Sequence, residues 1–144
     1  MSPPRIVVFD LDGTLVDTAP DLINALNFVL DREGLPPVPL ASARNMIGAG
    51  ARKLIERGLE VEDRSVSAAG LDRMLRDFID YYAEHIADES RPFEGLDAAL
   101  DDLESRGYRF AVCTNKLEWL SKLLLDRLDM SRRFVAICGA DTFG

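Results

Sequence analysis

Three aspartates lie close together near the start of the chain, in the string DLDGTLVD at residues 10–17. Extended backbone points residues i and i+2 the same way, so Asp10 and Asp12 can face one site. Two neighbouring carboxylates repel each other, and a hard cation such as Mg²⁺ or a shared proton stabilises the pair. Gly13 permits a tight turn whose backbone N–H groups can approach an anion. The string indicates cation or phosphate binding, although an acidic surface turn explains an isolated Asp-x-Asp pair equally well.

The residues before Asp10 predict the element that positions it. Ile6–Phe9 is a short apolar run rich in β-branched residues, which is typical of a strand buried on both faces of a parallel sheet. Two similar runs and two amphipathic helical patterns follow, at residues 96–103, 108–113, 117–128 and 134–138. This alternation predicts an α/β fold with a parallel sheet. Ligands of such sheets bind beyond the carboxyl ends of the strands, which is where Asp10 lies.

The stretch of residues 18–90 has helical patterns and no strand signal. Thr18 is a candidate N-cap for the first helix, with Asp21 at the capping-box position. Further helices are expected at about residues 42–46, 51–57 and 68–87. We therefore expect a helical insertion after the first strand, and a sheet domain formed by residues 1–17 and 91–144.

Composition narrows the function classes. The net charge is −8, from 17 Lys and Arg against 25 Asp and Glu, which disfavours binding to a nucleic-acid backbone. No apolar run approaches the ~18 residues of a membrane span. The four apolar residues before Asp10 are too few for a signal-peptide core, so we expect a cytoplasmic protein. Cys113 and Cys138 each lie in an apolar run and are expected to be buried, reduced thiols and not a disulfide.

The acidic string resembles the first signature of the haloacid dehalogenase superfamily, whose members are mostly phosphatases. Thr114, in the sequence VCTNK, resembles the second signature, and residues 91–95 look like the hinge loop before the core resumes. Residues 46–50 and the TNK form are similar to phosphoglycolate phosphatases, and residues 139–144 look like the segment ahead of the third signature. The resemblance covers essentially the whole chain. It implies a Rossmann-like core with a helical cap domain inserted after the first strand.

The resemblance also implies roles for the two acids. Asp10 is the expected nucleophile, forming an aspartyl-phosphate that splits one hard step into two. Asp12 is the expected general acid for the leaving alkoxide and then the base for the hydrolytic water. Because a halide leaves without a proton, Asp12 favours phosphoryl transfer over dehalogenation. Mg²⁺ is the expected cofactor, bridging the Asp10 carboxylate, the Asp12 carbonyl and a phosphate oxygen.

The phosphate itself is expected to contact the ends of two strands. The resemblance gives this role to the Thr114 hydroxyl and the Asn115 N–H, near the start of a helix, with Gly13 and Thr14 closing the cradle. Lys116 is a candidate contact for phosphate or a substrate carboxylate, with a solvated lysine in a first helical turn as the alternative. For Asp17, a hinge or capping role explains its position as well as catalysis does.

Family members carry two further signatures, a lysine and one or two acids, and the sequence stops at Gly144 before either. We expect a truncated chain with a core that is incomplete at its C-terminal end. The three strands are expected in the order third, second, first, which leaves the strand before Asp10 at an edge where the chain can self-associate. The expected activity is therefore assigned to the parent protein and not to the 144-residue chain alone.

The expected function is a Mg²⁺-dependent phosphatase that hydrolyses a small, phosphoglycolate-like phosphomonoester, with no nucleic-acid or membrane partner. One alternative is a phosphonatase or sugar-phosphate mutase with the same core. A phosphonatase needs a cap lysine for a Schiff base, and Lys53 is the only lysine of residues 18–90. The other alternative is a non-catalytic module that binds a metal or phosphate weakly.

Overall fold

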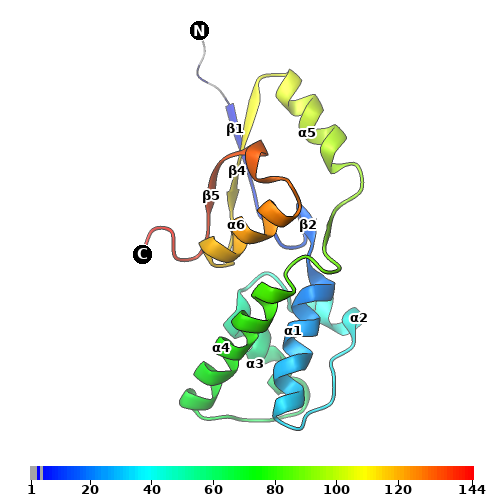
Figure 1. The fold of residues 1–144 in the computed structure, drawn as a ribbon, viewed down its shortest axis with the longest axis vertical. Coiled ribbons are helices and arrows are strands. Elements are labelled where there is room, and N and C mark those ends of the chain that lie inside the picture. Colours follow the sequence, from blue (N-terminus) through cyan, green and yellow to red (C-terminus); the bar gives the residue numbers. More distant parts are fainter. Residues whose placement is uncertain (1–2, 4) are drawn as a thin grey trace. The chain divides into compact units, whose positions relative to one another are not determined.

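The computed structural model describes residue 3 and residues 5–144, and the chain forms two compact units (Figure 1). One unit consists of the described residues up to Asp17 together with Arg91–Gly144, and the other is Thr18–Ser90. Within the described residues, no helix is long and apolar enough to cross a membrane. The roles of hydrolase core and cap for these two units remain a prediction.

The first unit is built on a parallel three-stranded sheet. Its strands are β1 (Arg5–Phe9), β4 (Tyr108–Cys113) and β5 (Phe134–Cys138), in the order β1-β4-β5. β1 and β5 both pair with β4 in parallel. The links between strands contain α5 (Leu96–Ser105), α6 (Glu118–Arg127) and the short 3₁₀-helix η2 (Ser131–Arg133). The predicted α/β class, strand order and strand direction are confirmed.

The prediction that β1 is buried on both faces is wrong. The side chains of Ile6 and Val8 are 53% and 60% exposed, and those of Val7 and Phe9 are half-buried. The steps from β1 to β4 and from β4 to β5 run in the same direction, so right-handed crossovers place both linking helices on one face. The other face is open along β1, and we call it the open face of the sheet.

The two cysteines are also more exposed than their apolar surroundings in the sequence predict. Both thiols are free, as predicted, but Cys113 is exposed and Cys138 is half-buried. They are register partners at the ends of β4 and β5. The prediction that they are buried is wrong because an apolar run reports strand propensity and not whether a second layer covers the strand.

A second, two-stranded sheet joins the segments on either side of the helical unit. β2 (Val16–Asp17) and β3 (Arg91–Pro92) are antiparallel, with Val16 opposite Pro92 and Asp17 opposite Arg91. The amide of Phe93 extends the pairing by donating to the Leu15 carbonyl at 3.2 Å. Neither strand was expected, because two residues are too few to show the alternation that identifies a strand.

The second unit contains only helices among its regular elements. These are α1 (Ala19–Arg32), α2 (Leu40–Ala43), the 3₁₀-helix η1 (Arg44–Met46), α3 (Ala51–Val61) and α4 (Ala68–Glu84). Buried side chains from α1, α3 and α4 form its core, including Leu26, Leu30, Ile55, Phe78 and Tyr82. The helices predicted at residues 51–57 and 68–87 are found as α3, which is longer, and α4, which ends earlier. In place of the helix expected at residues 42–46, the chain forms the short α2 followed by the 3₁₀-helix η1.

The start of α1 differs from the predicted capping box. Thr18 makes no side-chain cap, and its buried hydroxyl has no hydrogen-bond partner among the described residues. The buried Asp21 carboxylate instead accepts from the amides of Glu89 and Ser90, at 2.8–3.1 Å, and from the Ser90 hydroxyl at 2.6 Å. Asp21 thus ties α1 to the end of the helical unit, because three tertiary donors satisfy its carboxylate better than one helix amide does.

Candidate functional site

The acidic string forms a tight loop directly after β1. Leu11 and Leu15 are fully buried, and the Leu11 carbonyl accepts from the amides of Leu15 at 3.0 Å and Val16 at 3.2 Å. Gly13 has φ +77°, a left-handed conformation that favours glycine, so the predicted tight turn is present. Asp10 is exposed beside this loop, and its Oδ1 accepts from the Leu11 amide at 2.7 Å.

The hydrogen bonds of this loop limit how Gly13 and Thr14 can contact a phosphate. The Gly13 amide donates to the Val16 carbonyl at 2.9 Å, and the Thr14 amide donates to the Leu11 carbonyl at 3.2 Å. Both amides are therefore already used in forming the turn. Both residues are exposed, so the group that Thr14 offers to a ligand is its hydroxyl.

The end of β4 lies beside the end of β1. Phe9 is the register partner of Val112, so Asp10 and Thr114 come one and two residues beyond a paired position. Thr114 is buried, its amide donates to the Cys138 carbonyl at 3.0 Å, and its hydroxyl oxygen accepts from the Lys116 amide at 3.2 Å. The sheet thus places the two predicted signatures at one edge. Asn115, which lies between Thr114 and Lys116, is exposed.

Lys116 makes the contact that sequence reasoning missed. Its ammonium lies 3.1 Å from Asp12 Oδ1, and the two side chains are only 5% and 10% exposed. The alternative of a solvated lysine is therefore wrong. Lys116 also precedes α6 and does not lie in its first turn. The available signal was the placement of opposite charges after two neighbouring strands of a parallel sheet, which brings them to the same edge.

The segment after β5 holds this turn in place. The Ala140 amide donates to the Lys116 carbonyl at 2.9 Å, and Asp141 Oδ1 accepts from the Glu118 amide at 2.8 Å, at the start of α6. A Cβ atom on Gly139 would lie 2.3 Å from the Glu118 amide nitrogen and 2.5 Å from the Lys116 carbonyl oxygen. Only glycine permits this approach, because the atoms it meets belong to the backbone.

The donor set at the two acids fits a hard cation. Asp12 Oδ1 is buried and has no hydrogen-bond partner among the described residues, because its contact with Lys116 lacks hydrogen-bond geometry. Asp10 adds an exposed carboxylate, and carboxylate oxygens are ligands that Mg²⁺ prefers. Asp17, the third acid of the string, lies in β2. Within residues 3 and 5–144, no three or more His, Cys, Asp or Glu side chains form a group that could hold a metal.

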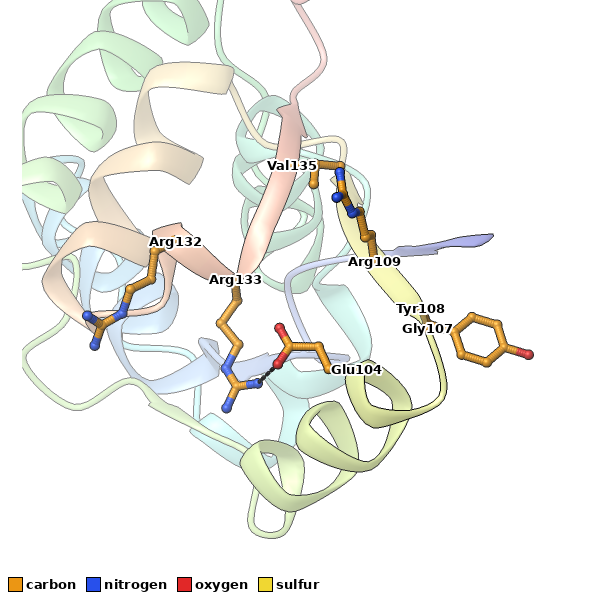
Figure 2. Close-up of a pocket in the computed structure, with 7 residues that line it drawn as sticks. All are labelled: Glu104, Gly107, Tyr108, Arg109, Arg132, Arg133 and Val135. Atoms are coloured by element: carbon orange, nitrogen blue, oxygen red, sulfur yellow. Dashed lines mark ion pairs between the residues drawn. The ribbon is translucent and has the colours of Figure 1, made fainter. Parts of the chain in front are cut away.

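A hollow of about 660 Å³ lies at the other end of the same sheet (Figure 2). Its lining includes Tyr108 at the start of β4, and Arg132 and Arg133 just before β5. Arg133 reaches α5, at 2.6 Å from Asp101 and 3.6 Å from Glu104. The hydrogen bond to Asp101 and then the surrounding acids raise the pKa of Arg133. Acids of α5 thus balance the charge of Arg133, and these ion pairs fasten η2 to α5. The hollow lies away from the strand ends that carry Asp10 and Asp12.

The fold and the site together define a class of protein. A parallel α/β sheet carries an exposed aspartate and a buried Asp–Lys pair beyond its first two strands, with a helical unit inserted after the first strand. The family model described as haloacid dehalogenase-like hydrolase matches residues 7–144. The chain belongs to the haloacid dehalogenase-like hydrolase family.

Individual proteins that are similar to this chain have names that fit this family. The chain is 50% identical over 135 residues to a protein named phosphoglycolate phosphatase from Caulobacter vibrioides, covering 94% of the chain and 57% of that protein. It is 46% identical to one of the same name from Mesorhizobium japonicum, covering 99% and 63%. The crystal structure of a predicted phosphoglycolate phosphatase from Haemophilus somnus superposes with a TM-score of 0.85 at 27% identity, covering 97% of the chain and 64% of that structure. The chain thus spans about three fifths of the length of these relatives.

Proposed function

We propose that the whole protein carrying this sequence is a phosphatase that hydrolyses a small organic phosphomonoester through an aspartyl-phosphate on Asp10. The observation that carries the proposal is the joint placement of an exposed Asp10, an Asp12 side chain that is only 10% exposed, and a buried Thr114 beyond two paired strands. The names of the relatives support phosphoglycolate as the substrate, and family membership supports a hydrolytic reaction.

The residues divide the reaction between them. The Asp10 carboxylate is exposed and can attack phosphorus, breaking the bond to the alkoxide, which takes the proton of Asp12. Asp12 then accepts a proton from the water that hydrolyses the aspartyl-phosphate, so free phosphate leaves and Asp10 is regenerated. The Thr114 hydroxyl, whose oxygen already accepts from the Lys116 amide, keeps its own proton to donate to a phosphoryl oxygen. Asn115 and Thr14 are further candidate phosphate contacts.

Mg²⁺ is the proposed cofactor, and the Asp10 carboxylate and the Asp12 backbone carbonyl would hold it. When bound, it offsets the repulsion between the acids and the phosphate and polarises the phosphoryl group. Residues 18–90 are the proposed cap, which selects the substrate, and the sheet unit is the proposed hydrolase core. The proposed setting is the cytoplasm, and the proposed small-molecule partner is a phosphate ester.

The structure offers no observation in favour of the phosphonatase alternative. A Schiff-base lysine is activated by a desolvated pocket or by a second cation. Lys53 is exposed on α3, and its ammonium pairs with Glu56 at 3.2 Å. Phosphate-ester hydrolysis, which needs no cap lysine, is therefore the function that we retain.

The proposal is tested by phosphate release from phosphoglycolate with Mg²⁺. The proteins are the 144-residue chain and a chimera completed with the C-terminal part of the Caulobacter relative. We expect the chimera to be active and Asp10→Asn to reduce its kcat by about a thousandfold or more. The matched control is Asp63→Asn, because Asp63 is exposed and its φ of +48° suits asparagine. A folded chimera that hydrolyses no phosphate ester, or that keeps its activity after Asp10→Asn, contradicts the proposal.

A further inference from the structure

The contact between Lys116 and Asp12 is a buried ion pair at a strand edge. The two groups approach to 3.1 Å, and neither side chain is more than one-tenth exposed. Asp12 Oδ1 accepts no hydrogen bond from any other described residue. A buried carboxylate that loses its counter-ion is strongly destabilising. The ammonium of Lys116 is thus what makes the burial of Asp12 Oδ1 tolerable.

The backbone around Lys116 is fixed on both sides. Its amide donates to the Thr114 hydroxyl at 3.2 Å, and its carbonyl accepts from Ala140 at 2.9 Å. Gly139 lies against the same turn, where a side chain would collide with backbone atoms. By contrast, Lys122 on α6 is exposed, and its ion pair with Glu118 at 3.4 Å stays on the surface. The backbone contacts with Thr114 and Ala140, at the carboxyl ends of β4 and β5, therefore fix the position of Lys116.

We propose that Lys116 is a positioning residue that holds the Asp12 carboxylate in the site and offsets its charge when no cation is bound. The relation to Mg²⁺ rests on the proposed function, because it requires that Asp10 and Asp12 bind the cation. The ammonium of Lys116 would repel a cation held by these residues. Removing the charge of Lys116 therefore has two opposite effects. The cation-free protein loses stability, and its affinity for Mg²⁺ increases.

The first experiment measures the pair without any metal. Urea unfolding in EDTA is followed by the fluorescence of Trp119, the only tryptophan, which is half-exposed three residues after Lys116. The proteins are the wild-type chain, Asp12→Asn, Lys116→Met and the double variant. We expect Lys116→Met to lower the urea midpoint of the wild-type chain but not that of Asp12→Asn. Equal shifts in both backgrounds overturn the proposed pair. Should Lys116→Met fail to fold, Lys116→Gln replaces it in the same cycle.

The second experiment measures Mg²⁺ binding by titration calorimetry. We expect Lys116→Met or Lys116→Gln to bind Mg²⁺ about tenfold more tightly than the wild-type chain. Lys116→Arg, which keeps the charge, and Lys122→Met, which removes a surface charge, should both bind as the wild-type chain does. Unchanged or weaker binding by the neutral Lys116 variants overturns the charge-offset role. The same titration is made on the completed chimera. If neither the wild-type chain nor the chimera binds Mg²⁺, the metal part of the proposed function fails as well, while the unfolding cycle still decides the ion pair.

Discussion

The helical unit surrounds its apolar side chains, whereas the sheet unit covers only one face of its strands. Phe78 and Tyr82 of α4 are fully buried among α1, α3 and α4. On the open face of the sheet, Ile6 and Val8 are more than half exposed, and Val135 of β5 is 54% exposed. Both units have an apolar core, but only the helical unit encloses that core with its own helices.

The difference follows from how the two kinds of element bury apolar surface. A helix presents one apolar stripe, and three helices packed together can cover all their stripes. A parallel strand presents apolar side chains on both faces, and each face needs its own layer. Both crossover helices of this sheet lie on the same side. The apolar side chains of β1 that point to the open face are therefore left uncovered.

Truncating a buried aromatic ring should have the largest effect. Phe78→Ala removes a side chain that is 1% exposed in the helical unit, and we expect it to reduce the free energy of unfolding by about 3–5 kcal/mol. Phe143→Ala deletes the same atoms from a side chain in the sheet unit that is 88% exposed, and should change that free energy by less than about 0.5 kcal/mol. Urea unfolding of both variants checks the contrast, and similar costs would contradict it.

Two glycine substitutions should have intermediate and unequal effects. Gly139→Ala forces a Cβ atom onto the backbone of Lys116 and Glu118 in the sheet unit, and should cost about 2–3 kcal/mol. Gly58→Ala in α3 meets only the side chain of Leu26, at 2.9 Å, which can move aside, so we expect a cost of about 1 kcal/mol or less. Thermal unfolding measures both. A larger cost for Gly58→Ala would mean that the helical core is the less adaptable of the two.

Placing a charge on the open face should have the smallest effect on stability. Val8→Lys should change the free energy of unfolding by less than about 1 kcal/mol, because Val8 is already exposed. We expect it to reduce self-association through the β1 edge, since lysine on an edge strand opposes pairing with another chain. Sedimentation velocity compares it with Val61→Lys, the same change at an exposed position of α3. Equal association in both variants would exclude the β1 edge as the contact.

Most regular elements could be predicted because periodicity is a local property of the sequence. The three parallel strands and the main helices follow from apolar runs and helical spacing, and the strand order follows from the family resemblance. Burial could not be predicted in the same way. Whether Val8 or Cys113 is covered depends on the direction of two crossovers, and no window of residues around either position reports it.

The candidate site shows the same division. Asp10, Asp12 and Thr114 could be placed at one end of the sheet from the sequence, because Asp10 and Thr114 each directly follow a strand and Asp12 lies two residues after Asp10. The same reasoning brings Lys116 to this end of the sheet, but its contact with Asp12 could not be specified, because that contact depends on the turn that Gly139 and Ala140 hold. Asp21 was assigned to a helix cap because the capping box is a local pattern, while its actual donors lie 68 and 69 residues away.

The short ribbon of β2 and β3 makes the helical unit an exchangeable insert. Val16 and Pro92 are register partners, so the chain leaves the sheet unit and returns to it at adjacent positions. The loop between them is already closed by backbone hydrogen bonds, and doubling its length would cost only about 0.6 kcal/mol in closure entropy. Residues 18–90 can therefore lengthen, shorten or be replaced with little entropic penalty to the strands that carry Asp10 and Thr114. With the cap role that we propose for residues 18–90, a fold built in this way can acquire a new specificity while keeping the same chemistry.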